Sequence, residues 1–259
     1  MGTLIGITIY AKSVNEAKAA FRAAFARISR LNQALSDYIP NSELNQISTT
    51  PRVISRELEI VLGFAQTLAR RTGGAFDITA GALIRHWRKT KTLPLPDNII
   101  SGYQHLHLNK GVAWVDDPRI RLDLGAIGKG YAADCALDEL KERGISRALI
   151  AVSGDVVCGA PPAGRSKWSI TAAGQEHQIT HAAVSTSGDA EQFTMVNGHR
   201  YSHILDPRTR LPLKNSRQVT VISRKGIESD ALATALAVLG DDQLLKDHYP
   251  YARALFTPS

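Results

Sequence analysis

Cysteine is scarce in this chain of 259 residues, with only two, at positions 135 and 158. They lie far apart and lack Cys-x-x-Cys spacing, so the sequence shows no zinc-binding or redox motif. We expect Cys135 to be a buried thiol on the apolar side of a helix. No apolar run approaches the ~20 residues that a membrane-spanning helix needs, and we predict no membrane span.

A strong excess of one charge is also missing, because 31 basic and 24 acidic residues give a net charge of +7. The basic stretch 85–91 could bind nucleic acid or an anionic ligand. No nucleic-acid-binding motif accompanies it, so we favour a solvated surface and predict no nucleic-acid partner. The chain has no internal repeat or low-complexity linker. Its length suits a single domain, 1–259, built of two interlocked lobes.

Hydrophobic periodicity predicts a mixture of helices and strands. Residues 3–10 alternate like a strand, and Ser13 with Glu16 forms a capping-box pattern before a helix. Residues 88–101 resemble a loop. Because strands and helices do not alternate strictly, we predict the α+β class. Further helices are expected at about 58–72, 128–143, 229–239 and 241–247, and further strands at 105–108, 112–115, 119–122, 147–152, 167–173, 177–185, 199–204, 218–223 and 252–257.

The most informative stretch is 123–134, Asp-Leu-Gly-Ala-Ile-Gly-Lys-Gly-Tyr-Ala-Ala-Asp. It joins a strand-like run to a helix and places three glycines around Lys129. Glycine allows close approach of a ligand, and a helix start offers free N–H groups to an anion. The lysine adds a positive charge for a phosphate. Asp123 could accept a hydrogen bond from a sugar hydroxyl or a ring N–H, or it could bind a metal. These features favour a nucleotide phosphate site.

Neither common nucleotide motif fits this stretch. Asp123 stands where a P-loop needs its first glycine, and Gly130 replaces the Ser or Thr that follows the lysine. The Rossmann spacing of glycines also fails. A glycine-rich turn with one solvated lysine therefore remains an equal alternative on this stretch alone.

Two other groups of residues suggest chemistry. Asp230 and Thr234 lie four apart on an expected helix and share a face, and their oxygens suit a hard cation such as Mg²⁺. The alternative is a charge near the helix start with a core threonine. His203 is a possible proton acceptor near neutral pH, or else a strand histidine with a structural hydrogen bond.

Four further segments, in order and spacing, extend the pattern: 73–79 (Gly-Gly-Ala-Phe-Asp-Ile-Thr), 184–189 (Val-Ser-Thr-Ser-Gly-Asp), 200–209 (Arg-Tyr-Ser-His-Ile-Leu-Asp-Pro-Arg-Thr) and 228–236 (Glu-Ser-Asp-Ala-Leu-Ala-Thr-Ala-Leu). With 123–134, and with the Met-Gly-Thr start and the segment 36–44, they resemble the FAD:protein FMN transferases of the ApbE family. The resemblance spans nearly the whole chain.

The resemblance implies a fold related to the tunnelling (T-fold) class, with the ligand site between two lobes. It implies Mg²⁺-dependent transfer of FMN from FAD to a Thr or Ser hydroxyl of a partner flavoprotein, with release of AMP. It assigns His203 as the catalytic base. It places the metal on Asp230, Thr234 and the backbone carbonyl of Ala126, and FAD contacts on Met1, Tyr38, Ala75, Phe76, Asp77, Asp123, Lys129 and Ile204.

This chain departs from the family pattern at three positions. Ala233 replaces an oxygen ligand of some relatives, Ser153 replaces a glycine, and Arg210 replaces a glycine after Asp-Pro-Arg-Thr. The implied acceptor motif, Asp-x-x-Ser/Thr-Gly-Ala-Ser/Thr, is absent here. Residues 77–83 come close, but Ala80 stands in place of the acceptor hydroxyl, so we predict no self-flavinylation there.

Two alternative functions remain open: Mg²⁺-dependent hydrolysis of FAD to FMN and AMP, and flavin binding without chemistry. No secretory leader is present, so we favour a cytoplasmic location. A periplasmic, membrane-anchored form is the alternative if a leader has been removed.

Overall fold

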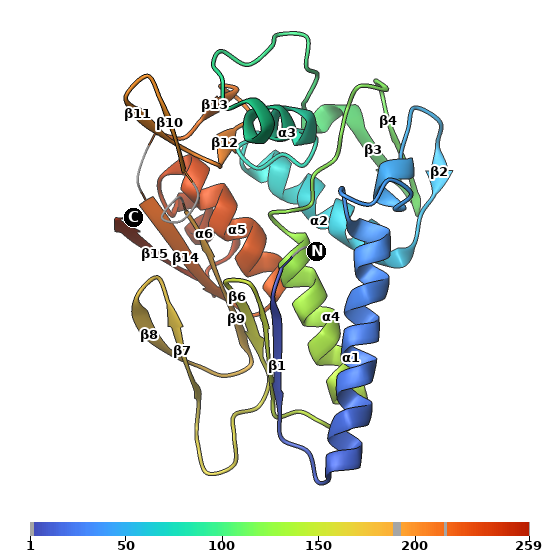
Figure 1. The fold of residues 1–259 in the computed structure, drawn as a ribbon, viewed down its shortest axis with the longest axis vertical. Helices are drawn as coiled ribbons and strands as arrows, with labels where there is room; N and C mark the ends of the chain where they lie inside the picture. The colour runs from blue at the N-terminus through green and yellow to red at the C-terminus, as the bar shows by residue number, and fades with distance from the viewer. Residues whose placement is uncertain (1–2, 189–192, 215–216, 259) are drawn as a thin grey trace.

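The computed structural model describes residues 3–188, 193–214 and 217–258 (Figure 1). The largest sheet of this described part is antiparallel throughout, with strands in the order β1-β5-β6-β9-β14-β15. The strands are β1 (Ile5–Ile9), β5 (Ala148–Val152), β6 (Asp155–Cys158), β9 (Ala182–Ser187), β14 (Arg217–Ser223) and β15 (Arg253–Pro258).

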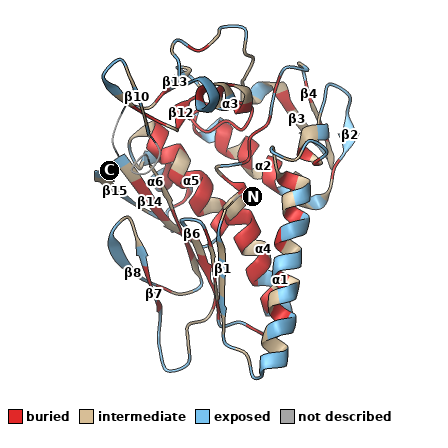
Figure 2. Ribbon diagram, viewed as in Figure 1, coloured by how far each residue is buried: buried red, intermediate tan, exposed pale blue. Residues whose placement is uncertain are grey.

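Helices α4 (Gly128–Glu142) and α5 (Gly226–Leu239) pack on one face of this sheet, and α1 (Val14–Leu35) packs on α4 (Figure 1). Alternate residues of β5 point toward them, and Ala148, Ile150 and Val152 join the buried cluster beneath α1 and α4. Helix α5 is apolar around most of its circumference because it is central in the molecule (Figure 2).

The N-terminal helices begin at hydroxyl caps. Ser13 accepts a hydrogen bond from the backbone N–H of Glu16 at α1, and Ser55 does the same for Leu58 at α2 (Arg56–Arg71). Helix α2 ends before Gly73 and Gly74, which both adopt positive φ angles. A ten-residue helix, α3 (Gly81–Thr90), follows and lies close to the cavity described below.

Short sheets surround this core. The six-residue helix α6 (Gln243–His248) precedes β15, and 3₁₀ turns occupy Leu44–Gln46 and Tyr103–His105. The remaining strands form β2 (Arg52–Val53) with β4 (Val112–Val115) and β3 (Leu106–Asn109), and the pairs β7 (Trp168–Ala172) with β8 (Gln175–Ile179), β10 (Phe193–Val196) with β11 (His199–Ser202), and β12 (Leu205–Asp206) with β13 (Leu211–Pro212).

The α+β class is confirmed, two strand predictions are wrong, and several elements were not predicted. The expected strand 177–185 is two strands, β8 and β9, because the chain turns at His181, where φ is 47°. The expected strand 119–122 is a single bridge between Arg121 and Ala80. Helix α3 was not predicted, and strand β6, which begins at Asp155, was missed after β5.

In the part of the chain that the structure describes, no helix combines the length and the hydropathy required to cross a membrane.

Candidate active site

A cavity of about 590 Å³ lies between the segments around α2 and α3 and the strand ends beside α5. This volume is typical of a pocket for a small organic ligand. Its lining brings together ten of the residues singled out in the sequence: Ala75, Phe76, Asp77, Asp123, Ala126, Lys129, His203, Ile204, Asp230 and Thr234.

The glycine-rich segment forms the start of α4, as its composition predicts. Asp123 anchors the turn, since its Oδ1 accepts from the backbone N–H of Gly125 at 2.7 Å. Further along, the N–H of Gly130 donates to Oδ2 of Asp230 at 3.0 Å. The carboxylate of Asp230 therefore accepts a hydrogen bond from one of the N–H groups that a helix start offers to an anion.

Close packing of α4 on α5 brings Asp230 to this position. A Cβ added to Gly130 would lie 2.0 Å from the carbonyl oxygen of Gly226, and one on Gly226 would lie 2.4 Å from the oxygen of Gly130. Only glycine permits this contact between two backbones.

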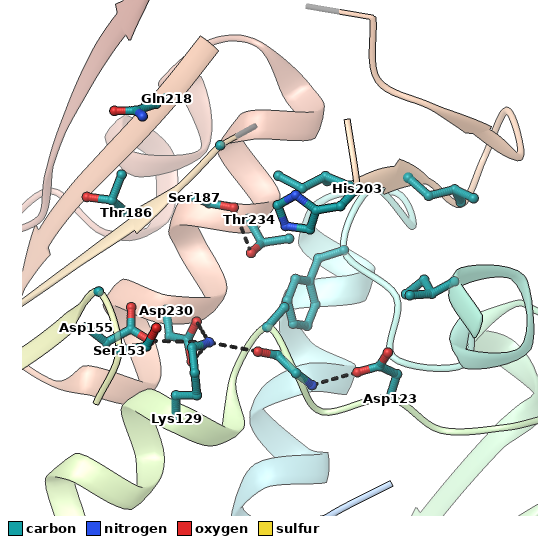
Figure 3. A pocket seen from close by; sticks show the side chains of 18 of the residues that line it. Asp123, Lys129, Ser153, Asp155, Thr186, Ser187, His203, Gln218, Asp230 and Thr234 are labelled. Atoms are coloured by element: carbon teal, nitrogen blue, oxygen red, sulfur yellow. Dashed lines mark hydrogen bonds and ion pairs between the residues drawn. The ribbon is translucent and has the colours of Figure 1, made fainter. Parts of the chain in front are cut away.

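Lys129, which is half-buried, lies at the centre of a charge cluster whose two carboxylates are buried (Figure 3). Its Nζ donates to the carbonyl of Gly125 at 2.8 Å and lies 3.1 and 3.3 Å from the two carboxylate oxygens of Asp230. It also lies 3.2 Å from Oδ2 of Asp155. The proposed solvated lysine is therefore excluded.

The two carboxylates set the ionisation of this cluster. Burial opposes the charge of Lys129, but the attraction of Asp230 and Asp155 outweighs it and raises the pKa of the lysine. Burial, reinforced by the negative charge of Asp230, raises the pKa of Asp155 in spite of the nearby ammonium group. The cluster thus contains a permanent cation between two carboxyl groups.

Oxygen donors for a cation gather beside this cluster. Thr234 lies one turn after Asp230 on α5, and its hydroxyl is 3.2 Å from that of Ser187 (Figure 3). The described residues contain no group of three or more His, Cys, Asp or Glu side chains arranged to hold a metal. A cation here would therefore depend on hydroxyl and carbonyl oxygens as well as carboxylates, a donor set that suits Mg²⁺ better than Zn²⁺. The buried Oδ2 of Asp155 faces the ammonium group of Lys129 at 3.2 Å, so this side of the cavity already accommodates a positive charge.

His203 lines the cavity from the connection between β11 and β12, and its ring lies near Thr234 (Figure 3). The flanking backbone is firmly held. The indole Nε1 of Trp87 donates to the carbonyl of Ser202 at 2.9 Å, and the N–H of Ile204 donates to the Ser202 hydroxyl at 3.0 Å. The imidazole is thus presented by a fixed segment of chain.

The segment after α2 forms another wall of the cavity. Ala75 and Phe76 are buried, and Oδ1 of Asp77 accepts from both the N–H and the hydroxyl of Thr79, at 2.8 and 2.7 Å. Asp77 therefore caps a turn, besides lining the cavity as a candidate FAD contact. Burial raises its pKa against these hydrogen bonds.

Two of the candidate residues stand apart. Tyr38 does not line this cavity: it is 74% exposed and borders a neighbouring pocket of about 720 Å³. Arg88 links the two pockets, since its Nη1 donates a hydrogen bond to the Tyr38 hydroxyl at 3.3 Å and lies 3.6 Å from Oδ2 of Asp123. Met1 lies outside the described residues, as does Asp189 of the segment 184–189.

Several lining residues had no assigned role in the sequence. Asp155 follows the Ser153-Gly154 turn, which was recognised only as a backbone feature; Ser153 adopts a φ of 57°, in the region that favours glycine. The residues 171–174 reach the cavity as the tip of the β7–β8 hairpin. No local pattern could have revealed them, because tertiary packing alone brings the hairpin to the cavity.

Comparison with known proteins shows which proteins share this arrangement. The model of the ApbE family matches residues 1–255. A protein of Vibrio cholerae named FAD:protein FMN transferase is 28% identical over 240 residues, covering 83% of this chain and 72% of the relative. A protein of the same name from Treponema pallidum is 29% identical over 298 residues, covering 99% of this chain and 82% of the relative.

Solved structures agree with these relatives. The flavin transferase ApbE from Vibrio cholerae superposes with a TM-score of 0.85 at 25% identity, covering 100% of this chain and 91% of that one. The ApbE protein of Thermotoga maritima gives a TM-score of 0.85 at 27% identity, covering 99% of this chain and 91% of that one.

Proposed function

Because the chain belongs to the ApbE family, we propose that it is an FAD:protein FMN transferase that moves FMN from FAD to a Thr or Ser hydroxyl of a partner flavoprotein and releases AMP. The observation that carries the proposal is the cavity itself. It gathers Lys129, Asp230, Thr234 and His203 from distant parts of the chain around one space of ligand size.

FAD is the substrate, and its pyrophosphate requires positive charge. Lys129 supplies one such charge, held in place by the carbonyl of Gly125. Ala75, Phe76, Asp77, Asp123 and Ile204 would contact the rest of FAD, with Tyr38 and Met1 at its periphery.

Asp230, Thr234 and the carbonyl of Ala126 would hold Mg²⁺. When bound, this ion neutralises negative charge on the pyrophosphate. Ala233 adds no side-chain ligand, and the hydroxyl of Ser187, 3.2 Å from that of Thr234, is a further oxygen donor nearby.

His203 acts as the base. It accepts the proton of the acceptor hydroxyl as that oxygen forms a bond to the FMN phosphorus. The bond between this phosphorus and the bridging oxygen breaks, and AMP leaves with the electron pair. The product is FMN joined to the acceptor by a phosphoester. Holding the two reactants in line supplies much of the rate acceleration.

The test mixes the protein with FAD, Mg²⁺ and a small acceptor domain that carries Asp-x-x-Thr-Gly-Ala-Thr, followed by intact mass measurement of the acceptor. We expect the acceptor to gain the mass of one FMN joined through a phosphoester. When EDTA is present from the start of the reaction, the acceptor should gain no mass. An acceptor domain with alanine at both threonines of the motif is the control and should gain nothing.

The other outcomes identify the alternatives. AMP release without modification of the acceptor would indicate FAD hydrolysis. Bound FAD with neither product, over a panel of acceptor domains, would indicate a flavin-binding protein and contradict the proposal.

A further inference from the structure

The ammonium group of Lys129 is surrounded by oxygens in the way that a bound cation is. The carbonyl of Gly125, both carboxylate oxygens of Asp230 and Oδ2 of Asp155 lie between 2.8 and 3.3 Å from Nζ (Figure 3). The carboxylate of Asp230 also accepts from the N–H of Gly130. The residue assigned to the metal is therefore already neutralised by the protein's own cation.

A divalent ion and this ammonium group compete for Asp230. An ion bound to the carboxylate at about 2 Å would stand roughly 5 Å or less from Nζ, since Nζ is 3.1 Å from Oδ1. Two positive charges at this separation in a buried site repel strongly. Metal binding and the observed position of Lys129 therefore disfavour each other.

Asp155 offers the lysine a second partner. It is 3% exposed, it is the first residue of β6, and its Oδ2 faces the ammonium group of Lys129. A buried carboxylate in this condition is costly unless a positive charge stays beside it. Nζ already lies 3.2 Å away, so the lysine can leave Asp230 without losing its counter-ion.

We propose that Lys129 fills the cation site of the substrate-free enzyme and moves from Asp230 toward Asp155 and the substrate phosphates when the metal binds. Lys129 thus opposes metal binding until a pyrophosphate attracts it, and Asp155 is the positioning residue that holds it afterwards. This inference rests on the metal assignment in the proposed function.

Mn²⁺ alone, titrated against the protein without nucleotide and followed by electron paramagnetic resonance, tests the inference. We expect Lys129→Met to bind Mn²⁺ about tenfold or more tightly than the parent, a typical size for coupling between sites. Lys141→Met is the matched control, because Lys141 lies on the same helix but pairs with exposed Asp138. It should bind Mn²⁺ as the parent does.

Loss of the lysine leaves two buried carboxylates together, so Lys129→Met is expected to be less stable. Lys129→Gln, which keeps a donor for the Gly125 carbonyl, is the second variant. Mn²⁺ should raise the melting temperature of either variant more than that of the parent, because tighter binding stabilises the folded state more. Mn²⁺ affinity no higher than the parent's in both variants would overturn the inference.

Asp155 is tested separately by Asp155→Asn. Lys129 then has Asp230 as its remaining carboxylate partner, and Mn²⁺ binding should weaken about fivefold or more. Unchanged affinity would remove Asp155 from the proposal. These titrations contain neither FAD nor acceptor, so their failure is distinct from a failure of FMN transfer, which is observed as the mass of the acceptor.

Discussion

His203 is the single side chain on which the proposed chemistry depends most. Replacement with alanine should slow FMN transfer by about 10²–10⁴-fold, the usual contribution of a general base. FAD affinity should be nearly unchanged, because the hydrogen bonds from the Trp87 indole to the Ser202 carbonyl and from the Ile204 N–H to the Ser202 hydroxyl hold the segment independently of the imidazole. The rate is measured as acceptor mass gained per unit time, and FAD binding by calorimetry.

The matched control is His199→Ala, at the exposed first residue of strand β11 in the same segment. It should transfer FMN at the parental rate. A His203→Ala variant as fast as this control would exclude His203 as the base.

Asp230 is the second decisive residue. Asp230→Ala removes the one carboxylate of the proposed metal set, so we expect Mg²⁺-dependent turnover to fall by at least about 10²-fold. EDTA should reduce the parent to a similar level. AMP release measured over a range of Mg²⁺ concentrations, with circular dichroism to verify folding, tests this. Full activity of Asp230→Ala would place the metal elsewhere.

At the level of whole elements, the crossing of α4 and α5 determines where the site residues lie. Gly130→Ala would push a methyl group into the backbone of Gly226 and separate the helices. We expect a loss of about 3 kcal/mol or more in the free energy of unfolding, from urea denaturation. Turnover should fall as well, because the bond between the Gly130 N–H and Asp230 is disrupted.

Gly128→Ala, one residue before Lys129, is the control for this effect. Its added Cβ would lie 3.8 Å from Leu124, an ordinary contact. Its stability should stay the same or rise by up to about 1 kcal/mol from better helix propensity. Equal stabilities of the two alanine variants would contradict the tight crossing.

The start of α5 depends on a side chain from another helix. Asp134 of α4 accepts from the N–H groups of Gly226 and Ile227, at 2.7 and 3.0 Å, while Lys225 provides no side-chain cap. Asp134→Ala should therefore cost about 1–2 kcal/mol in unfolding free energy, as the loss of an N-cap does. Asp138→Ala, at an exposed position one turn later, should change stability by no more than about 0.5 kcal/mol. If Asp134→Ala lost no more unfolding free energy than Asp138→Ala, Asp134 would not be the cap of α5.

For the molecule as a whole, the arrangement predicts that the enzyme modifies a partner and not itself. Thr79, in the segment that resembles an acceptor motif, is fully buried, and its hydroxyl bonds to Asp77 and to the N–H of Gly102. After incubation with FAD and Mg²⁺, the intact mass of the protein should be unchanged. An added FMN on Thr79 or a neighbouring residue would contradict this.

Much of the framework is predictable from local patterns. The hairpin of β3 and β4 around Asn109-Lys110-Gly111, helix α4, which ends at Glu142 shortly before Gly144, and helix α5 all lie close to their expected bounds. Their signals are short-range: turn residues, helix stops and apolar periodicity. Errors occurred where tertiary contacts decide, as at 119–122, where the chain makes one bridge instead of a strand.

By itself, the sequence determined the α+β class, the family and ten of the residues that line the cavity, because these depend on residue type and on order along the chain. Only the tertiary structure decided what those residues contact. It paired Lys129 with Asp230 and with Asp155, and it kept Tyr38 out of the cavity. The physical reason is that carboxylates 26 and 101 positions away from Lys129 reach it only after the chain has folded. The strength of these ion pairs depends on how deeply the carboxylates are buried, which no local sequence pattern records.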